Sequence, residues 1–342
     1  MSANRDFEVK TGDAGGDLPP PRRTRAGALA LHILSTHGLL VFGILLVVFF
    51  ALLLPSTFTG SQNFRAILGN NTTVALLALS EMFVIATGNY DLSIAYNVGL
   101  MHIVAMGLLT DAMLPWPVVV ILTITVGGLI GWINGLLVEY AKIDSFIATL
   151  GVGTILYGCG SWYTNGTQLV GHVPLAFANL NDAKFATIPV PTYMVAVIAI
   201  IAWVCLEHIP VGRRLYAIGS NRKAAELTGI PARRLVMGAF VSSGLIVGLA
   251  GVLLAARLQV AQSSVGPEFL LPAFVGALLG ATTVRPGRVN AWGTIIAVLV
   301  LAVGIAGLQQ LGNSFFAEPI FQGAALIISV GLAGYAARRR KR

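Results

Sequence analysis

The chain has 342 residues, of which 56% are hydrophobic and only 11% charged, and its mean hydropathy is +0.81. Soluble domains carry about 25% charged residues, so this composition excludes a single large water-soluble core and favours a polytopic helical membrane protein, whose spans need about 20 apolar residues each. The net charge of +8 gathers at the ends of apolar stretches, which predicts contact with anionic lipid headgroups and argues against nucleic-acid binding.

Most basic residues lie in clusters that long apolar stretches separate. The five clusters are Arg5 to Arg25, Lys142, Arg213 to Arg234, Arg285 with Arg288, and Arg338 to Arg342. Short loops rich in Lys and Arg stay in the cytoplasm. About ten transmembrane helices would place all five clusters, and both the N and C termini, on the cytoplasmic side.

In chain order, a polar segment over residues 1–30 is predicted to be a disordered cytoplasmic tail, because it is rich in Gly, Pro and Arg. Residues 31–337 are predicted to form one all-α transmembrane bundle, and 338–342 a basic cytoplasmic tail. Two predicted spans, 93–110 and 270–284, fit re-entrant or interrupted helices as well as full crossings. The predicted spans are 38–54, 70–87, 93–110, 116–138, 145–163, 191–206, 235–256, 270–284, 290–311 and 319–336.

Glycines recur four residues apart in several of these spans. Gly127, Gly131 and Gly135 share one span, and Gly244 and Gly248 share another. Such spacing lets helix backbones approach closely in lipid. We expect helix packing within one subunit, with a seam between two subunits as the alternative.

The sequence carries no catalytic or metal-binding motif. None of the five lysines follows a glycine, so the phosphate loop of an ATPase is missing, and the two cysteines form no metal-binding pattern. The chain is therefore predicted not to be an enzyme, and the energy for transport would come from a partner or an ion gradient. Placing Glu81 inside a membrane span costs free energy. This residue would either anchor two helices through a hydrogen bond or serve an ion-driven carrier.

The longest predicted cytoplasmic loop, residues 207–234, is expected to contain a short helix. Ser220 or Asn221 can cap its start, good helix formers follow at 224–227, and Gly229 is placed to end it. A helix of about two turns is too short to be stable alone. It would dock on a partner or rest on its own bundle.

This loop resembles the coupling loop of ABC importer permeases of the ribose type, the membrane subunits of bacterial monosaccharide importers. The resemblance is carried by Gly212 to Asn221 (GRRLYAIGSN) and Ala224 to Ile230 (AAELTGI). Asp91 to Ser93, Phe146 to Leu150 and the segment from Gly244 to Leu258 agree with it. The similarity extends over about residues 30 to 336.

The resemblance implies a subunit of a larger importer in the bacterial inner membrane. A second permease copy or paralogue would pair with the chain, a periplasmic solute-binding protein would deliver the sugar, and a cytoplasmic ATPase would bind ATP and Mg²⁺, so that this chain needs no cofactor. The loop 164–190 would face outward, with Ala176, Phe177 and Lys184 receiving the binding protein. The residues expected to couple to the ATPase are Asn221, Arg222, Lys223, Glu226, Leu227 and Gly229.

The passage itself is expected to use polar residues in broken or glycine-rich spans. These are Glu81, Asp91, Ser93, Asn97, Asn134, Thr149, Asn165 and Thr282.

The chain departs from the family pattern at residues 88–96, which read GNYDLSIAY where the family usually has GGIDLSVGS. Tyr90 and Tyr96 would stack on a sugar or fill space. The predicted cargo is a monosaccharide. The alternatives are a polyol, a sugar-derived signal, a nucleoside or a branched-chain amino acid, and, in another class, an ion-coupled secondary transporter that uses Glu81.

Overall fold

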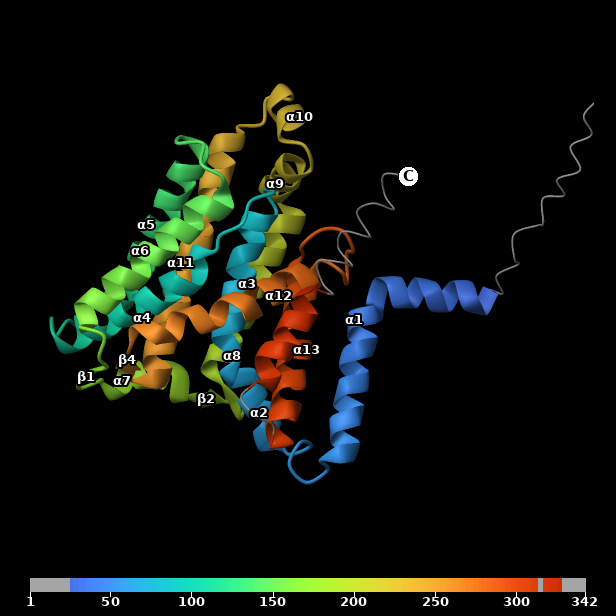
Figure 1. Ribbon diagram of the computed structural model, residues 1–342, viewed down its shortest axis with the longest axis horizontal. Coiled ribbons are helices and arrows are strands. Elements are labelled where there is room, and N and C mark those ends of the chain that lie inside the picture. The colour runs from blue at the N-terminus through green and yellow to red at the C-terminus, as the bar shows by residue number, and fades with distance from the viewer. Residues whose placement is uncertain (1–24, 313–315, 328–342) are drawn as a thin grey trace, which may run out of the picture.

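The computed structural model describes residues 25–312 and 316–327, which form a helical bundle with four two-residue strands (Figure 1). The first helices are α1 (Arg25–Leu53), α2 (Ser61–Asn70), α3 (Thr72–Ile85), α4 (Ser93–Thr110), α5 (Trp116–Glu139), α6 (Ser145–Thr164) and α7 (Leu175–Asp182). They are followed by α8 (Val190–Trp203), the π-helix η1 (Val204–His208), α9 (Pro210–Ser220), α10 (Arg222–Leu227), α11 (Ala232–Leu258), the 3₁₀ helix η2 (Ser263–Phe269), α12 (Leu270–Gly280) and α13 (Ala291–Gln310). Residues 317–327 are also helical.

The predicted all-α membrane bundle is confirmed. Among the described residues, six helical segments are long and apolar enough to cross a membrane, and α2 with α3 makes a seventh if that bent pair is one span. The apolar part of α1, Gly38–Leu53, is shorter. The count of about ten and the cytoplasmic termini stay predictions, since 1–24 and 328–342, with the end of the predicted span 319–336, lie outside the described residues.

Two predicted stretches are divided more finely than their hydropathy indicated. The predicted span 70–87 begins at a break, where α2 and α3 meet at 43°. Asn71 lies at the break and its side chain donates to the carbonyl of Ile67 (2.8 Å), which satisfies one free carbonyl at the end of α2.

The predicted outer loop 164–190 contains α7 and short strands. Strand β1 (Leu169–Val170) pairs with β4 (Val260–Ala261), and β2 (Lys184–Phe185) with β3 (Ile188–Pro189).

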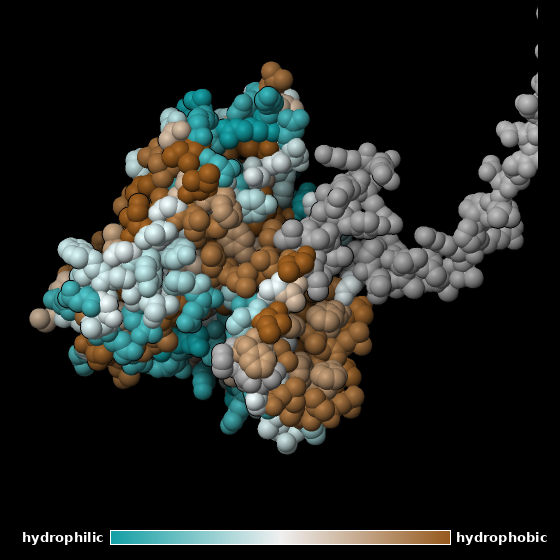
Figure 2. Space-filling view, in the orientation of Figure 1, coloured by the Kyte–Doolittle hydropathy of each residue, from teal (hydrophilic) through white to brown (hydrophobic). Residues whose placement is uncertain are grey.

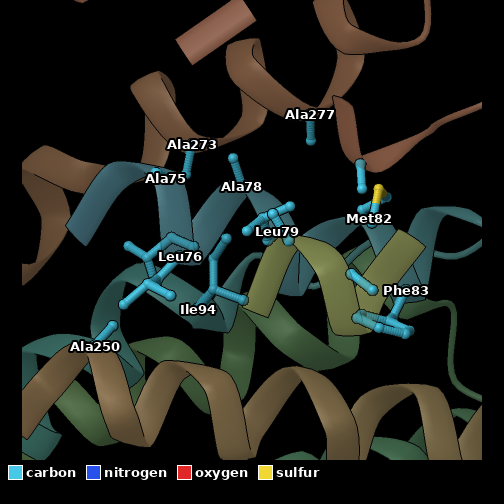
Figure 3. Close-up of a cluster of buried hydrophobic side chains, with 14 of the residues drawn as sticks. Ala75, Leu76, Ala78, Leu79, Met82, Phe83, Ile94, Ala250, Ala273 and Ala277 are labelled. Carbon is cyan, nitrogen blue, oxygen red and sulfur yellow. The ribbon is translucent and has the colours of Figure 1, made fainter. Parts of the chain in front are cut away.

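Helix α3 lies at the centre of the bundle. Every residue from Thr72 to Val84 is buried. Figure 3 shows Ala75 and Ala78 of α3 close to Ala273 of α12, while Leu76 and Ile94 lie toward Ala250 of α11. The small alanines let these helices approach closely, which is how helices associate in lipid.

The five glycines that the sequence singled out lie in one contact between α5 and α11. A Cβ built on Gly131 would overlap the carbonyl oxygen of Phe240, and one on Gly127 would lie 2.5 Å from that of Gly244. A Cβ on Gly248 would lie 2.7 Å from the Cα of Ile124, and Gly135 packs on Met237. The glycine stripe therefore joins two helices of the same chain.

The bundle has two chemically different ends. Lys142, the α9–α10 region and Arg285 with Arg288 meet at one end, hereafter the basic end. The β1–β4 and β2–β3 pairs and α7 lie at the opposite end (Figure 1). Figure 2 shows hydrophilic residues over α10 and hydrophobic residues along the flank of α5 and α6. The three basic clusters that fall on described side chains thus share one side, as the charge pattern predicts for the cytoplasmic face.

Candidate functional site: the coupling helices and the polar cluster beneath them

Two helices, α9 and α10, project from the basic end. The Asn221 side chain accepts a hydrogen bond from the Ala224 backbone N–H (3.1 Å), so Asn221 is the N-cap of α10. Gly229, at φ +81°, ends the turn that follows α10, a backbone conformation that suits glycine. Sequence reasoning missed α9, although its buried Gly212, Leu215 and Ile218 recur at helical spacing.

Helix α10 is fixed to the end of α5 by a bidentate ion pair. Arg222 donates through Nη1 to Oε1 of Glu139 (2.7 Å) and through Nη2 to Oε2 (2.5 Å). Glu139 is fully buried, and Arg222 Nε also donates to exposed Glu226 (3.0 Å). The hydrogen bonds that Arg222 donates to Glu139 raise the pKa of Arg222 above its usual value, so the guanidinium stays protonated. Arg222 was expected to offer its charge to a partner, but it is held within the chain.

A second set of contacts fixes η1 and α9 to the loop before α13. Arg285 Nη1 lies 2.8 Å from Oε2 of Glu207. The Arg288 guanidinium lies 4.2 Å above the Tyr216 ring, a cation–π contact, and Tyr216 donates to the carbonyl of Val289 (2.8 Å). Burial is the main cause that raises the pKa of Tyr216 to about 12, so its hydroxyl stays protonated and keeps donating. Sequence reasoning did not assign any of these five residues to the site.

The end of α9 rests directly on the turn between α3 and α4. A Cβ on Gly219 would lie 2.5 Å from the carbonyl oxygen of Ala86 and 3.1 Å from the Gly88 nitrogen. Gly88 itself has φ +81°, which an L side chain adopts only with strain. The backbones are in contact, so a displacement of α9 pushes on the turn that carries Asp91.

Asp91 is the centre of a buried hydrogen-bond network. The Asp91 backbone N–H donates to Oε1 of Glu81 (3.0 Å), and its own carboxylate accepts from the Ser93 hydroxyl (2.5 Å) and from Asn134 (3.3 Å). Asn134 also donates to the Ser93 hydroxyl (2.7 Å). The Thr149 hydroxyl accepts from the Leu92 backbone N–H (2.9 Å). The network therefore links α3, α4, α5 and α6.

Five of the eight residues predicted for the passage meet in this polar cluster, which we define as Glu81, Asp91, Ser93, Asn134 and Thr149. Glu81 Oε2 and Asn134 Oδ1 have no partner among the described residues. The other three lie elsewhere. Asn97 is buried in α4, Asn165 is the exposed left-handed cap of α6, and the Thr282 hydroxyl donates to the carbonyl of Leu279 (2.7 Å).

The two unusual tyrosines pack against other side chains. The Tyr96 ring covers Gly153 of α6, where a Cβ would lie 2.5 Å from a ring carbon, and Tyr90 stacks on Phe274 at 6.3 Å between centroids. Of the residues expected to receive a binding protein, Ala176 and Lys184 are exposed, but Phe177 is fully buried. The expectation for Phe177 was wrong, because its large apolar side chain fills the core under α7.

The exposed face of α10 has an apolar residue that no described part of the chain covers. Leu227 is 89% exposed, and Lys223 and Glu226 are exposed beside it. Ile230, which follows Gly229, packs partly buried on the bundle. Leu227 therefore lies accessible on an anchored helix outside the apolar spans. Within the described residues, no group of three His, Cys, Asp or Glu side chains could hold a metal ion.

The fold and this site define a class: a multi-pass helical membrane protein that exposes an anchored helix, α10, at its basic end. Comparison with known proteins agrees, because the family model described as branched-chain amino acid transport system / permease component matches residues 63–330. The chain belongs to this permease family. No solved structure matches it.

Its relatives include import permeases named for ribose and for autoinducer 2. The ribose import permease protein RbsC of Bacillus subtilis is 34% identical over 289 residues, which cover 84% of this chain and 89% of the relative. RbsC of Haemophilus influenzae is 29% identical, and the match again covers 84% of this chain and 89% of the relative. The autoinducer 2 import system permease protein LsrD of Escherichia coli K12 is 30% identical, over 75% of this chain and 79% of LsrD.

Proposed function

We propose that this chain is the membrane permease subunit of an ATP-driven, binding-protein-dependent importer in a bacterial inner membrane, and that its cargo is a monosaccharide. Its relatives named for ribose and autoinducer 2 import support the solute class. The observation that supports the energy source is the exposed Leu227 on α10, which Arg222 and Glu139 anchor. ATP and Mg²⁺ are bound by a separate ATPase.

Coupling runs from α10 to the polar cluster by contacts that the structure already contains. The ATPase binds the face of α10 around Lys223 and Leu227 and changes conformation as it hydrolyses ATP. Arg222 transmits that motion to Glu139 at the end of α5, which also carries Asn134 of the polar cluster. Gly219 transmits it to the Gly88 turn and so to Asp91. Both routes end on the same hydrogen-bond network.

A second permease copy or a paralogue completes the passage beside α6. This helix is 20 residues long but falls short of the six long spans in hydropathy. Its outer face has exposed Thr154, Tyr157 and Trp162, and Cβ atoms built on Gly151 and Gly158 would meet nothing within 4 Å. The same face also exposes Ile147, Leu150 and Ile155, so it is mainly apolar; its two glycines would let a helix of another subunit approach closely. A periplasmic binding protein delivers the solute at the opposite end.

A sugar-derived signal is the second candidate cargo, because the chain is also 30% identical to an autoinducer 2 permease. An ion-coupled carrier would instead depend on Glu81. Glu81 accepts a hydrogen bond from Asp91, and both residues are part of one network. That carrier would take up solute without ATP.

The test replaces Leu227 with aspartate in the complete importer, reconstituted with its ATPase and binding protein. We expect ATP-driven uptake to fall by about tenfold or more, since a buried apolar interface contact becomes a charge, while the amount of folded permease is unchanged because Leu227 contacts little of its own chain. Leu227→Met is the matched control and keeps uptake. Normal uptake by Leu227→Asp, or uptake of equal rate without ATP, would overturn the proposal.

A further inference from the structure

A polar recess of about 650 Å³ lies between α2, the end of α11, η2, α13 and the helix 317–327. Small-molecule sites occupy about 300–1,000 Å³. Helix α11 begins at the basic end, so Arg257 near its other terminus places the recess at the opposite end of the bundle. It is separate from the polar cluster, with which it shares no lining residue.

The lining of the recess is rich in hydrogen-bonding side chains. It contains three asparagines, four glutamines, two glutamates and one arginine: Asn63, Asn70, Asn71, Gln262, Gln309, Gln310, Gln322, Glu268, Glu318 and Arg257. Intramembrane polar groups are costly and usually functional. Several hold each other in place: Gln310 donates to Asn63 (2.7 Å), and Gln309 and Gln322 both donate to Glu318 (3.1 and 3.0 Å).

The recess also contains polar groups that are free to bind a solute. Arg257 donates through Nη1 to the carbonyl of Asn70 (2.9 Å), and it has no carboxylate within 4.0 Å in the described part of the chain. Gln310 Oε1 is buried and lacks a partner among the described residues. Buried polar groups of this kind are normally satisfied, which indicates that a molecule with complementary groups enters the recess.

We propose that this recess binds one neutral, polyhydroxylated molecule of monosaccharide size on the outward side of a single subunit; the proposal rests on the proposed function. The two glutamates and Arg257 give the lining a net charge of −1, which disfavours an anion. Sugar hydroxyls accept from Arg257 and donate to Glu268 and Gln310, and Phe269 offers an apolar face for ring C–H groups. An aliphatic amino acid would pair its carboxylate with Arg257 and its ammonium with Glu268, but its apolar side chain would leave the amides of the recess unpaired.

Protection of an introduced cysteine by a panel of solutes tests the proposal. Ala306 lines the recess, so Ala306→Cys is introduced into the full chain after Cys159 and Cys205 are replaced by alanine. Right-side-out membrane vesicles are treated with a membrane-impermeant maleimide, alone and with D-ribose, D-xylose, D-galactose, D-glucose or L-leucine. We expect labelling from outside, and an approximately tenfold slower rate when one sugar is present at about ten times its Kd.

Two matched controls isolate the recess. Ala112→Cys lies exposed at the same end but outside the recess, so it is labelled and not protected. Introducing Arg257→Ala into the Ala306→Cys chain raises the sugar concentration that is needed for protection by about tenfold or more. The reason is that hydrogen bonds to charged groups contribute about 1.5–3 kcal/mol. Arg65→Ala, which removes the same charge from α2 outside the lining, leaves protection unchanged.

The outcomes separate the recess from the importer. No labelling of Ala306→Cys from outside, protection by none of the sugars, or protection by leucine alone would overturn the recess as a sugar site. ATP-driven uptake by the cysteine-free parent chain is measured in parallel. Uptake without protection rejects the recess and keeps the importer, whereas protection without ATP-driven uptake rejects the importer and keeps the recess.

Discussion

At the scale of single residues, Glu139 has the largest structural role at the basic end. It is fully buried and paired with Arg222, which is about one-third exposed. Removing one member of a buried pair leaves the other charge without compensation. The pair therefore stabilises α10 only while both members are present.

We predict that Glu139→Gln lowers the stability of the detergent-solubilised protein by about 1.5–3 kcal/mol, since Arg222 loses charge-assisted hydrogen bonds to a buried carboxylate and keeps only exposed Glu226 as its partner. Glu226→Gln is the matched control: it removes the exposed partner of the same arginine, and it should cost less than about 1 kcal/mol. Thermal unfolding of both variants measures the two losses of stability. Equal melting temperatures would show that the Arg222–Glu139 pair does not hold α10 in place.

Residue roles could be predicted where the residues are neighbours in the sequence. Asn221 and Gly229 follow from the rules for helix caps, because a cap is a local feature. The Arg222–Glu139 pair joins positions 83 apart, and no periodicity connects them. Phe177 shows the opposite error: a loop position was taken as exposed, whereas α7 buries its ring.

At the scale of elements, the α5–α11 contact depends on the absence of side chains. The hydrophobic effect does not drive helices together in lipid, because lipid tails are themselves apolar. Close packing of the helix backbones therefore has to stabilise the contact. Gly127, Gly131, Gly244 and Gly248 interlock backbone against backbone. A methyl group at the centre of that contact would separate the two helices.

We predict that Gly131→Ala destabilises the solubilised protein by about 1–3 kcal/mol, the usual cost of overpacking. Gly238→Ala is the matched control on α11 itself, because a Cβ there meets nothing within 4 Å; it should be neutral or slightly stabilising, since alanine favours helix. The melting temperatures of the two variants are compared. Equal destabilisation by both would mean that helix propensity, rather than the α5–α11 contact, sets the effect.

The helices that hydropathy predicted well are those with long uninterrupted apolar runs, such as α5 and α13. Those it missed are polar or short. Helix α9 has a mixed face that the bundle partly buries, α2 ends at an asparagine, and α7 has only eight residues. Their positions depend on tertiary contacts, which a hydropathy profile does not contain.

At the scale of the whole molecule, the two ends of the bundle differ in charge and polarity. The basic end presents Leu227 on an anchored helix, and the opposite end contains the polar recess. The sequence predicted the basic end because its lysines and arginines lie together along the chain. The recess escaped prediction, because its polar residues come from five segments spread between Asn63 and Gln322.

The central claim is that this permease operates with a separate ATPase. The most direct measurement purifies the tagged chain from its own membranes in mild detergent and identifies the proteins that accompany it by mass spectrometry. We predict an ATPase with a phosphate loop in stoichiometric amount with the wild-type chain and with Leu227→Met, and its loss from Leu227→Asp. Reproducible recovery of the wild-type chain alone would contradict the account.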